Sequence, residues 1–371
     1  NWWIVSEGGN DRIRGRGGDD TIYGGLQGDY LYGDAGIDTI TGGASEPNRI
    51  EGGDDDDTIT GGANRDIALG QAGDDEIATL GGNDAVIGGA DDDRLNGGDD
   101  DDILIGGDGG DEVFGNAGDD VLFVIDVSLG AEFSEQPWSG GVNDLYDGGA
   151  GEDLIVVNDD IDITLSNINL QMSVYGNHTA GNIEVAHLTG GASANTIDAA
   201  GFSGRTIIRG KGENDILRGG SDTDVIEGGD GDDTITANAG NDTITGGAGT
   251  NTLTGGHDDD TYVFNDITAI DTVLESAAGG DDRLDLNAVS SDLTLAVGDG
   301  TESHAIVIEK QAGLLTVQVT NDEVETIQLG SGNNDLRIKD GGSTAANIDA
   351  GNGTNLISYQ GGYGAWSAWS S

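Results

Sequence analysis

The chain has no cysteine, only two prolines and few aromatic residues, and each shortage narrows the class of protein. Without cysteine it has neither a disulfide framework nor a thiolate metal site. Aromatic residues make up 5% of the 371 residues while glycine supplies 69, so a thick core of large side chains is not favoured. Such a chain can bury apolar area by stacking small aliphatic residues in a thin, repetitive solenoid.

Basic residues are also scarce, since 14 Lys and Arg stand against 70 Asp and Glu and give a formal net charge of −56. Folding brings these carboxylates together, and their repulsion opposes a compact state unless cations enter the structure. The alternative is an acidic solvated surface, a halophilic surface or a disordered acidic tail, but the acids here are spaced rather than clumped. Nucleic acid is not expected as a partner because its phosphates would be repelled.

Long hydrophobic runs and the common catalytic signatures are missing as well. No run of 18 or more apolar residues occurs, so no membrane span is expected. The chain begins at Asn1 without Met or a signal peptide, which indicates a processed form or a fragment. The four histidines do not form H-E-x-x-H, and no G-x-S-x-G occurs. We therefore expect that the chain is not an enzyme.

A nine-residue repeat organises most of the first third of the chain and a second stretch further on. Its unit is G-G-x-G-x-D-x-U-x, where U is aliphatic, and 33–41 is a typical copy. The repeating acids, which we take as candidate metal ligands, are Asp11, Asp20, Asp29, Asp38, Asp57, Asp66, Asp75, Asp84, Asp93, Asp102, Asp111 and Asp120, then Asp144 and Asp153, and finally Asp215, Asp224, Asp233, Asp242 and Asp260.

The segments between the repeats alternate polar and apolar residues in the manner of β-strands, and helical periodicity is hard to find. Residues 183–188 resemble 324–329, which indicates a larger repeat of roll and cassette. The expected organisation is a first roll at 1–123, an interruption and β-rich cassette at 124–189 with a short roll piece at 140–156, a second roll at 190–263, a second cassette at 264–340, and the opening of a third roll with a tail at 341–371.

Nine residues divide into a six-residue turn and a three-residue strand. Glycine allows the turn a positive φ and a close approach that a Cβ would forbid, while Asp-x-U-x sends U to one face of the strand. Two units then form one 18-residue coil with two strands and two turns. We expect an all-β fold in which each U residue faces inward between two thin parallel sheets.

Stacked turns would bring the Asp of one coil to within roughly 4.8 Å of the next coil. A divalent cation between two such carboxylates would remove their repulsion, and glycine-turn carbonyls could complete the six or seven oxygen ligands that Ca²⁺ accepts. Oxygen-only ligation disfavours zinc, copper and iron. The predicted ion-sharing pairs are Asp57 and Asp75, Asp75 and Asp93, Asp93 and Asp111, Asp66 and Asp84, Asp84 and Asp102, Asp102 and Asp120, Asp215 and Asp233, and Asp224 and Asp242.

Other acids precede the repeating Asp, among them Asp56, Asp74, Asp92, Asp101, Asp119 and Asp232. They are either solvated side chains or further cation ligands, and the sequence favours the first reading.

These units resemble the nonapeptide of the RTX, or haemolysin-type, calcium-binding repeat family. The resemblance covers roughly 8–123, 140–156 and 190–263. It implies a right-handed parallel β-roll, calcium in the turns, and export through a one-step bacterial secretion channel while the chain is still unfolded. The chain departs from the pattern where Asn48 and Asn251 replace Asp, and where Gln27, Asp55, Asn64, Asp91 and Asp100 replace a glycine.

Two functions fit this sequence. The first is a secreted calcium-binding structural or adhesive protein of the bacterial cell surface, such as a surface-layer, matrix or fibre component, which folds on calcium binding after secretion. Its expected partners are calcium ions, further copies of itself, or cell-surface and matrix components. The second is the calcium-dependent secretion and folding module at the C-terminal end of a larger RTX enzyme or toxin. The roll and cassette repeat favours the first.

Overall fold

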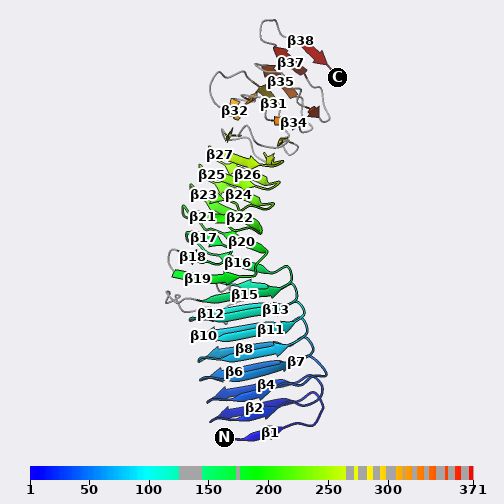
Figure 1. Cartoon of the computed structure of the whole chain (residues 1–371), viewed down its shortest axis with the longest axis vertical. Helices are drawn as coiled ribbons and strands as arrows, with labels where there is room; N and C mark the ends of the chain where they lie inside the picture. The colour runs from blue at the N-terminus through cyan, green and yellow to red at the C-terminus, as the bar shows by residue number, and fades with distance from the viewer. Residues whose placement is uncertain are drawn as a thin grey trace. The chain divides into compact units, whose positions relative to one another are not determined.

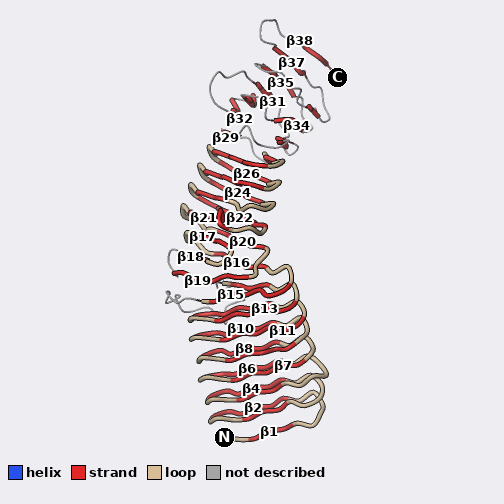
Figure 2. The backbone as a smooth tube through the Cα atoms, in the orientation of Figure 1, coloured by secondary structure: helices blue, strands red, loops and turns tan. Residues whose placement is uncertain are grey.

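The computed structural model describes residues 1–124, 144–172, 176–264, 271–274 and 282–286, and, as backbone strands, 293–297, 306–311, 314–319, 324–329, 334–339, 347–349, 356–360 and 367–370. Every regular element in these ranges is a β-strand (Figure 2). The described residues accordingly contain no helix long and apolar enough to cross a membrane. The predicted all-β parallel roll is confirmed.

The chain forms two compact units. Unit 1 contains Asn1–Asp159 and Thr164–His187, and unit 2 contains Asp160–Ile163 and Leu188–Ser371. Both are drawn in Figure 1, where strand labels follow the chain. The roll and cassette boundaries expected from the sequence stay predictions.

Unit 1 consists of two parallel sheets whose strands alternate along the chain. One sheet has the order β2 (Arg12–Gly17), β4 (Tyr30–Ala35), β6 (Arg49–Asp54), β8 (Ile67–Ala72), β10 (Ala85–Ala90), β12 (Ile103–Asp108), β14 (Val121–Phe123) and β16 (Leu154–Asn158). The other has β1 (Trp3–Val5), β3 (Thr21–Tyr23), β5 (Thr39–Thr41), β7 (Thr58–Gly62), β9 (Glu76–Leu80), β11 (Arg94–Asp99), β13 (Glu112–Ala117), β15 (Leu145–Ala150) and β19 (Gly176–Gly181). β18 (Leu170–Met172) pairs antiparallel with β19.

Unit 2 repeats this arrangement. One sheet contains β22 (Arg205–Gly212), β24 (Val225–Asp230), β26 (Thr243–Ala248), β28 (Thr261–Val263), β30 (Asp282–Leu286), β34 (Val324–Leu329) and β36 (Asn347–Asp349). The other contains β21 (Thr196–Gly201), β23 (Ile216–Arg218), β25 (Thr234–Ala239), β27 (Thr252–His257) and β29 (Asp271–Leu274), followed by antiparallel β32 (Ile306–Gln311) and β33 (Leu314–Val319). A third sheet holds β31 (Leu293–Val297), β35 (Asn334–Lys339), β37 (Leu356–Gln360) and β38 (Ser367–Ser370). The two remaining strands are β17 (Ile163–Ser166) and β20 (Val185–Thr189).

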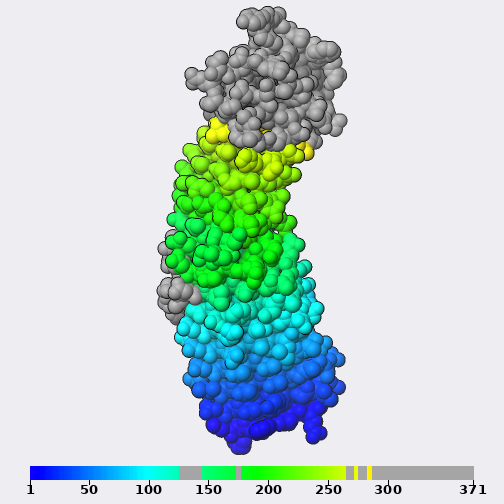
Figure 3. Space-filling view, in the orientation of Figure 1, coloured from blue at the N-terminus to red at the C-terminus, as the bar shows by residue number. Residues whose placement is uncertain are grey.

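The core of each unit consists of two files of mostly aliphatic side chains, one from each of its two sheets. Val86 pairs in register with Leu104 one coil later, and both are fully buried. The same is true of Ile235 and Leu253 in unit 2. In the space-filling view, consecutive coils form consecutive bands of colour, so each coil packs on its neighbours in sequence (Figure 3). The predicted inward position of U is therefore confirmed.

Glycine is required where successive turns touch. Gly36 has a φ of 116°, and a Cβ built on it would lie 2.7 Å from the carbonyl carbon of Gly18 in the preceding coil. Four of the five residues that replace a repeat glycine, Gln27, Asp55, Asp91 and Asp100, also adopt positive φ, between 74° and 79°. The turn keeps its shape there at the cost of a strained L-residue.

Candidate metal sites

The turns of each unit place their repeating polar residues in two rows, one on each side of the roll. Every one of the candidate acids lies in such a row. In unit 1 the rows are Asp11, Asp29, Asn48, Asp66, Asp84, Asp102, Asp120, Asp153 and Glu184, and Asp20, Asp38, Asp57, Asp75, Asp93, Asp111, Asp144 and His178. In unit 2 they are Asn195, Asp215, Asp233, Asn251 and Asp271, and Thr206, Asp224, Asp242, Asp260 and Asp282.

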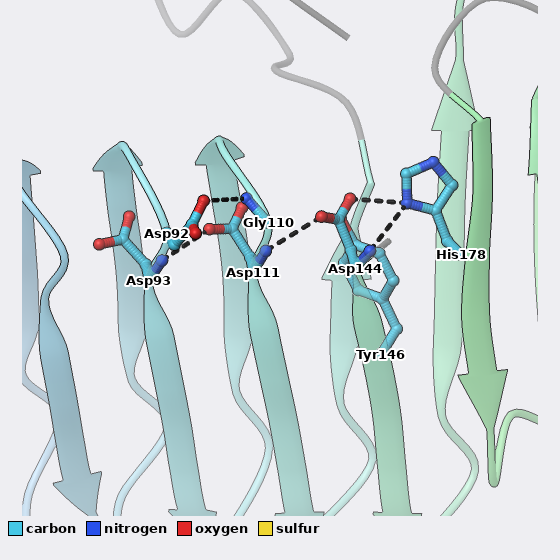
Figure 4. Close-up of polar contacts among 7 residues, drawn as sticks. All are labelled: Asp92, Asp93, Gly110, Asp111, Asp144, Tyr146 and His178. Atoms are coloured by element: carbon cyan, nitrogen blue, oxygen red, sulfur yellow. Dashed lines mark hydrogen bonds and ion pairs between the residues drawn. The ribbon is translucent and has the colours of Figure 1, made fainter. Parts of the chain in front are cut away.

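Neighbours in a row are joined by a hydrogen bond from backbone to side chain. The backbone N–H of Asp75 donates to Asp93 Oδ1 at 2.9 Å, and that of Asp93 donates to Asp111 Oδ1 at 3.0 Å (Figure 4). All eight predicted ion-sharing pairs are joined in this way, at 2.6 to 3.0 Å. The structure therefore brings each pair together, and the cation between them stays a prediction.

The second carboxylate oxygen of most repeating Asp residues is buried and has no hydrogen-bond donor among the described residues. From Asp20 to Asp120 these Asp residues are at most 2% exposed. A buried carboxylate oxygen without a partner is costly, so this atom is a natural ligand for a cation. The residues with such an Oδ2 are Asp20, Asp29, Asp38, Asp57, Asp66, Asp75, Asp84, Asp93, Asp102, Asp111, Asp120, Asp153, Asp215, Asp233, Asp242 and Asp260.

Each of these Oδ2 atoms borders a small space that we call the cradle. It is bounded by the first residue of the turn, which is glycine except at Thr79 and Ala237, by the Oδ2 five residues later, and in most turns by the carbonyl oxygen of the residue one coil after that first residue. A Cβ built on Gly15 would lie 2.6 Å from Asp20 Oδ2 and 2.7 Å from Gly33 O, so the space exists because Gly15 has no side chain. Within the described ranges, no three His, Asp or Glu side chains converge on a metal-sized point. A cation in a cradle must therefore take several ligands from the backbone, as Ca²⁺ readily does.

Burial disfavours the charged form of these carboxylates. It raises the pKa of Asp93 to about 9, against the lowering effect of the hydrogen bond from Asp75, and the charges of Asp111 and Asp75 add to the rise. The pKa of Asp242 is raised to about 8 for the same reasons, with burial again the main cause. Without a cation, the rows thus hold protons more tightly than free carboxylates do.

Asp144 differs from the other acids of its row because the protein itself supplies partners for its second oxygen. Tyr146 donates its hydroxyl to Asp144 Oδ2 at 3.3 Å, and His178 Nδ1 lies 2.7 Å from the same oxygen (Figure 4). Burial and the charge of Asp144 raise the pKa of the Tyr146 phenol well above its ordinary value, so the hydroxyl remains a donor. Asp144 consequently has a weak structural case for holding a cation, as do Asp11 and Asp224, whose Oδ2 atoms accept from the Ser6 hydroxyl and the Gly220 N–H.

Two of the three asparagines in the rows, Asn48 and Asn251, donate a side-chain N–H to the next carboxylate. Asn48 donates its side-chain N–H to Asp66 Oδ1 at 3.0 Å, and Asn251 donates to Asp271 Oδ1 at 2.8 Å. An amide thus supplies a donor at the position where Asp would leave a second acceptor.

The exposed acids before the repeating Asp form a second ladder. The backbone N–H of Asp74 donates to Asp56 Oδ1 at 3.0 Å, and Asp92 donates to Asp74 Oδ1 at 3.1 Å. Gly110 continues this ladder by donating to Asp92 (Figure 4). Its bonds run back along the chain, whereas those of the buried row run forward, so each turn is tied to both of its neighbours.

Sequence reasoning missed several members of the rows. Asp271 and Asp282 accept hydrogen bonds from Asn251 and Asp260, and Glu184 takes the place above Asp153. The nonapeptide spacing is lost at these positions because insertions separate the coils. For Asp271 and Asp282, the shorter signal of an acid two residues before a buried aliphatic, Val273 or Leu284, would have found them.

Comparison with known proteins gives one matching family. The profile of the RTX calcium-binding nonapeptide repeat (4 copies) matches residues 3–31, 24–46, 42–77, 51–86, 69–104, 79–113, 87–122, 200–235 and 227–262. No curated protein matches. Among solved structures, the crystal structure of extracellular lipase LipA from Serratia marcescens is similar, with 14% identity and a TM-score of 0.20 over 62% of this chain. The match spans 38% of the lipase chain.

Proposed function

Because this chain belongs to the RTX calcium-binding nonapeptide repeat family, we propose that it is an extracellular structural or adhesive protein that folds when calcium enters its stacked turns. One observation carries the proposal, namely the rows of buried Asp Oδ2 atoms that have no donor within the part of the chain that the structure describes. Each borders a cradle, and most cradles are also lined by a backbone carbonyl oxygen. These are hard oxygen ligands of the kind that Ca²⁺ prefers.

The residues that would hold calcium are the repeating Asp residues, through Oδ2, together with the carbonyl groups of the first glycines. Bound calcium supplies positive charge that offsets the burial of the carboxylates. The protein's own contribution is positional, since the N–H groups of the preceding coil fix Oδ1 and so aim Oδ2 into the cradle. In Asp93, for example, Oδ1 is fixed by Asp75 and Oδ2 is left for the ion.

Calcium binding is coupled to folding in this proposal because the ligands of one cradle come from consecutive coils. An unfolded chain has no such site, so the binding free energy becomes folding free energy. With 70 acidic residues against 14 basic ones, the calcium-free chain is also held apart by its own charge. The chain would stay expanded in a low-calcium cytoplasm and fold outside the bacterial cell.

This coupling predicts a large spectroscopic change. We expect the calcium-free protein at pH 8 to show a reduced β signal by circular dichroism and a lowered melting temperature, and about 10⁻⁴–10⁻³ M calcium to restore both, as for extracellular calcium modules. Atomic emission after gel filtration would count the bound ions. Equal β content with and without EDTA would contradict coupled folding.

One face of unit 1 supports association with a second copy. The first two outward residues of β8, β10, β12, β14 and β16 are apolar and pair in register, and the polar Gln71 and Asn158 follow them on β8 and β16. We call these apolar residues the apolar outer face. They are Ile67, Leu69, Ala85, Ile87, Ile103, Ile105, Val121, Phe123, Leu154 and Val156. The outward positions of the other sheet carry charges at Glu76, Arg94 and Glu112.

A second copy carries the same charge of −56 and is repelled over most orientations. The apolar outer face contains no acid, so two copies can meet there by stacking sheet on sheet. We expect the calcium-loaded protein to associate reversibly in sedimentation velocity, and Ile103→Asp to weaken association by about tenfold or more because Ile103 is 46% exposed on this face. Thr58→Asp, on the other sheet, is the matched control. Monomeric wild-type protein at high concentration would contradict self-association.

A further inference from the structure

We propose that the turns of Asp84 and Asp242 exclude calcium, because Thr79 and Ala237 occupy the position that glycine holds in the neighbouring turns. This inference rests on the proposed function, since it concerns which cradles can accept the ion. It divides the rows into segments that bind calcium and interruptions that do not. The cradles concerned are those of Asp84 and Asp242.

The cradle is too small to hold both a side chain and an ion. A Cβ built on Gly70 would lie 2.7 Å from Gly88 O and would overlap the Asp75 carboxylate. On Gly88, a Cβ would lie 2.5 Å from Gly106 O and would overlap Asp93. The missing Cβ of the first glycine is therefore what keeps the space beside Oδ2 open.

Thr79 stands five residues before Asp84, in the place of that glycine. It is fully buried, and its hydroxyl donates to Gly97 O at 2.9 Å. Gly97 lies one coil later, and the equivalent carbonyl lines the cradle in neighbouring turns such as that of Gly88. The Thr79 hydroxyl thus takes the oxygen that an ion would use, and its Cβ fills the cradle.

Ala237 has the same position five residues before Asp242 and is also fully buried. Its methyl group fills the cradle without supplying a hydrogen bond. The carbonyl oxygen of Ala237 lies 2.6 Å from a Cβ built on Gly219, so it still lines the cradle of the preceding coil. The interruption is therefore confined to Asp242 and leaves the backbone ligand of the Asp224 turn in place.

The two rows of unit 1 are unequal as a result. One row combines a first glycine with an Asp in every turn from Asp20 to Asp111. The other is broken by Asn48, whose amide replaces a carboxylate, and by Thr79. We infer that calcium fills one side of unit 1 continuously and the other side in short segments.

The test is to reopen the closed cradles. Thr79→Gly and Ala237→Gly, made separately in the full chain, should each raise the number of calcium ions per chain by one in atomic emission after equilibration with calcium. Each should also raise the melting temperature in calcium more than in EDTA. Ala63→Gly is the matched control, because Ala63 is an exposed turn residue outside the cradle, and it should leave the count unchanged.

Two further variants test whether the Cβ or the hydroxyl of Thr79 excludes the ion, and whether the exclusion can be transferred to another turn. Thr79→Ala keeps the Cβ and removes the hydroxyl, so it should gain no ion if the space itself is decisive. Gly88→Thr copies the interruption into the continuous row and should lose at least one ion. Should Gly88→Thr fail to fold, the glycine variants still decide the matter, because they introduce the residue that neighbouring turns already carry.

The outcomes distinguish this inference from the proposed function. A wild-type protein that binds no calcium would overturn the proposed function. A wild-type protein that binds several ions, with counts unchanged in both Thr79→Gly and Ala237→Gly, would overturn the inference alone. A gain in only one of the two variants would restrict the interruption to that turn.

Discussion

Each repeating Asp uses its two carboxylate oxygens for different purposes. In Asp93, Oδ1 accepts the N–H of Asp75 and holds two coils in register, while Oδ2 is buried at the cradle. The first contact needs only an acceptor, and an asparagine amide could provide it. The second contact needs a negative charge, because only a carboxylate attracts a divalent ion strongly. Asn48 and Asn251 show that the row tolerates loss of the second function.

Replacing Asp93 by Asn should separate these purposes. Asp93→Asn keeps the acceptor for Asp75 and removes a carboxyl whose pKa is raised to about 9. In calcium-free buffer at pH 8 the variant should therefore melt about 2–5 °C higher than wild type, a shift of roughly 1 kcal/mol. In millimolar calcium it should melt lower and bind at least one ion fewer.

Differential scanning calorimetry with and without calcium measures both effects. Asp92→Asn, at the exposed neighbouring position, is the control and should change neither by more than about 0.5 kcal/mol. A calcium-loaded Asp93→Asn protein as stable as wild type would show that the Asp93 charge does not serve an ion.

At the scale of the strand, the buried aliphatic of each unit holds its coil to the next. Leu217 of β23 pairs with Ile197 and Ile235, and all three are fully buried. Ile216, the preceding residue on the same strand, is 41% exposed. We expect Leu217→Ala to lower the free energy of unfolding of the calcium-loaded protein by about 2–5 kcal/mol. Ile216→Ala should cost less than about 1 kcal/mol.

Urea unfolding followed by circular dichroism gives these free energies. Because a solenoid coil contacts only its neighbours, the loss in Leu217→Ala should be local to unit 2. Hydrogen exchange would check this, since amides of unit 1 such as that of Leu95 should keep their protection. Equal losses in the two variants would contradict the assigned inward position.

The strands and their pairing could be predicted because the repeat is regular. An offset of 18 residues predicts that Val86 lies beside Leu104, and the register confirms it. The offset fails where segments are inserted, since Asp111 is joined to Asp144 and Asp260 to Asp282. The stacking continues across these insertions, so the distance along the chain changes while the spatial neighbour does not.

The positions of the candidate ligands could be predicted from the sequence, but whether each site is open to a cation could not. Spacing alone places Asp84 and Asp93 in equivalent turns, yet Thr79 fills the first cradle and Gly88 leaves the second open. Likewise, Tyr146 reaches Asp144 from two residues along the chain, and His178 reaches it from β19. Such contacts depend on side-chain packing, which periodicity does not record.

At the scale of the whole molecule, the rows of buried carboxylates give stability an unusual dependence on pH. Burial raises the pKa of Asp57 and Asp102 to about 7, that of Asp242 to about 8 and that of Asp93 to about 9, from the ordinary value of 3.8 for an Asp carboxyl. Between the ordinary pKa of 3.8 and these raised pKa values, the calcium-free folded state therefore binds more protons than the unfolded state. The part of the free energy of unfolding that these raised pKa values contribute is fully present below about pH 4 and is lost as the pH rises towards 9.

We expect the calcium-free protein to melt at a higher temperature at pH 5 than at pH 8. Calcium should reverse this order, because the ion binds the deprotonated carboxylates and must displace their protons at low pH. Melting curves between pH 4 and pH 9, in calcium-depleted buffer and in millimolar calcium, test both statements. Calcium-depleted protein that is more stable at pH 8 would contradict the raised pKa values.

In the buried rows each N–H donates to the coil that follows it in the chain. This direction also gives assembly of the roll a direction along the chain. Asp75 presents its N–H to the coil that follows, and the cradle beside Asp75 is lined by Gly88 O from that same coil. A coil that has just formed therefore lacks some of its calcium ligands until the next coil docks. The C-terminal end of a growing roll always carries an incomplete site. Shortening the roll from its C-terminal side would shift this unfinished end one coil earlier instead of abolishing it.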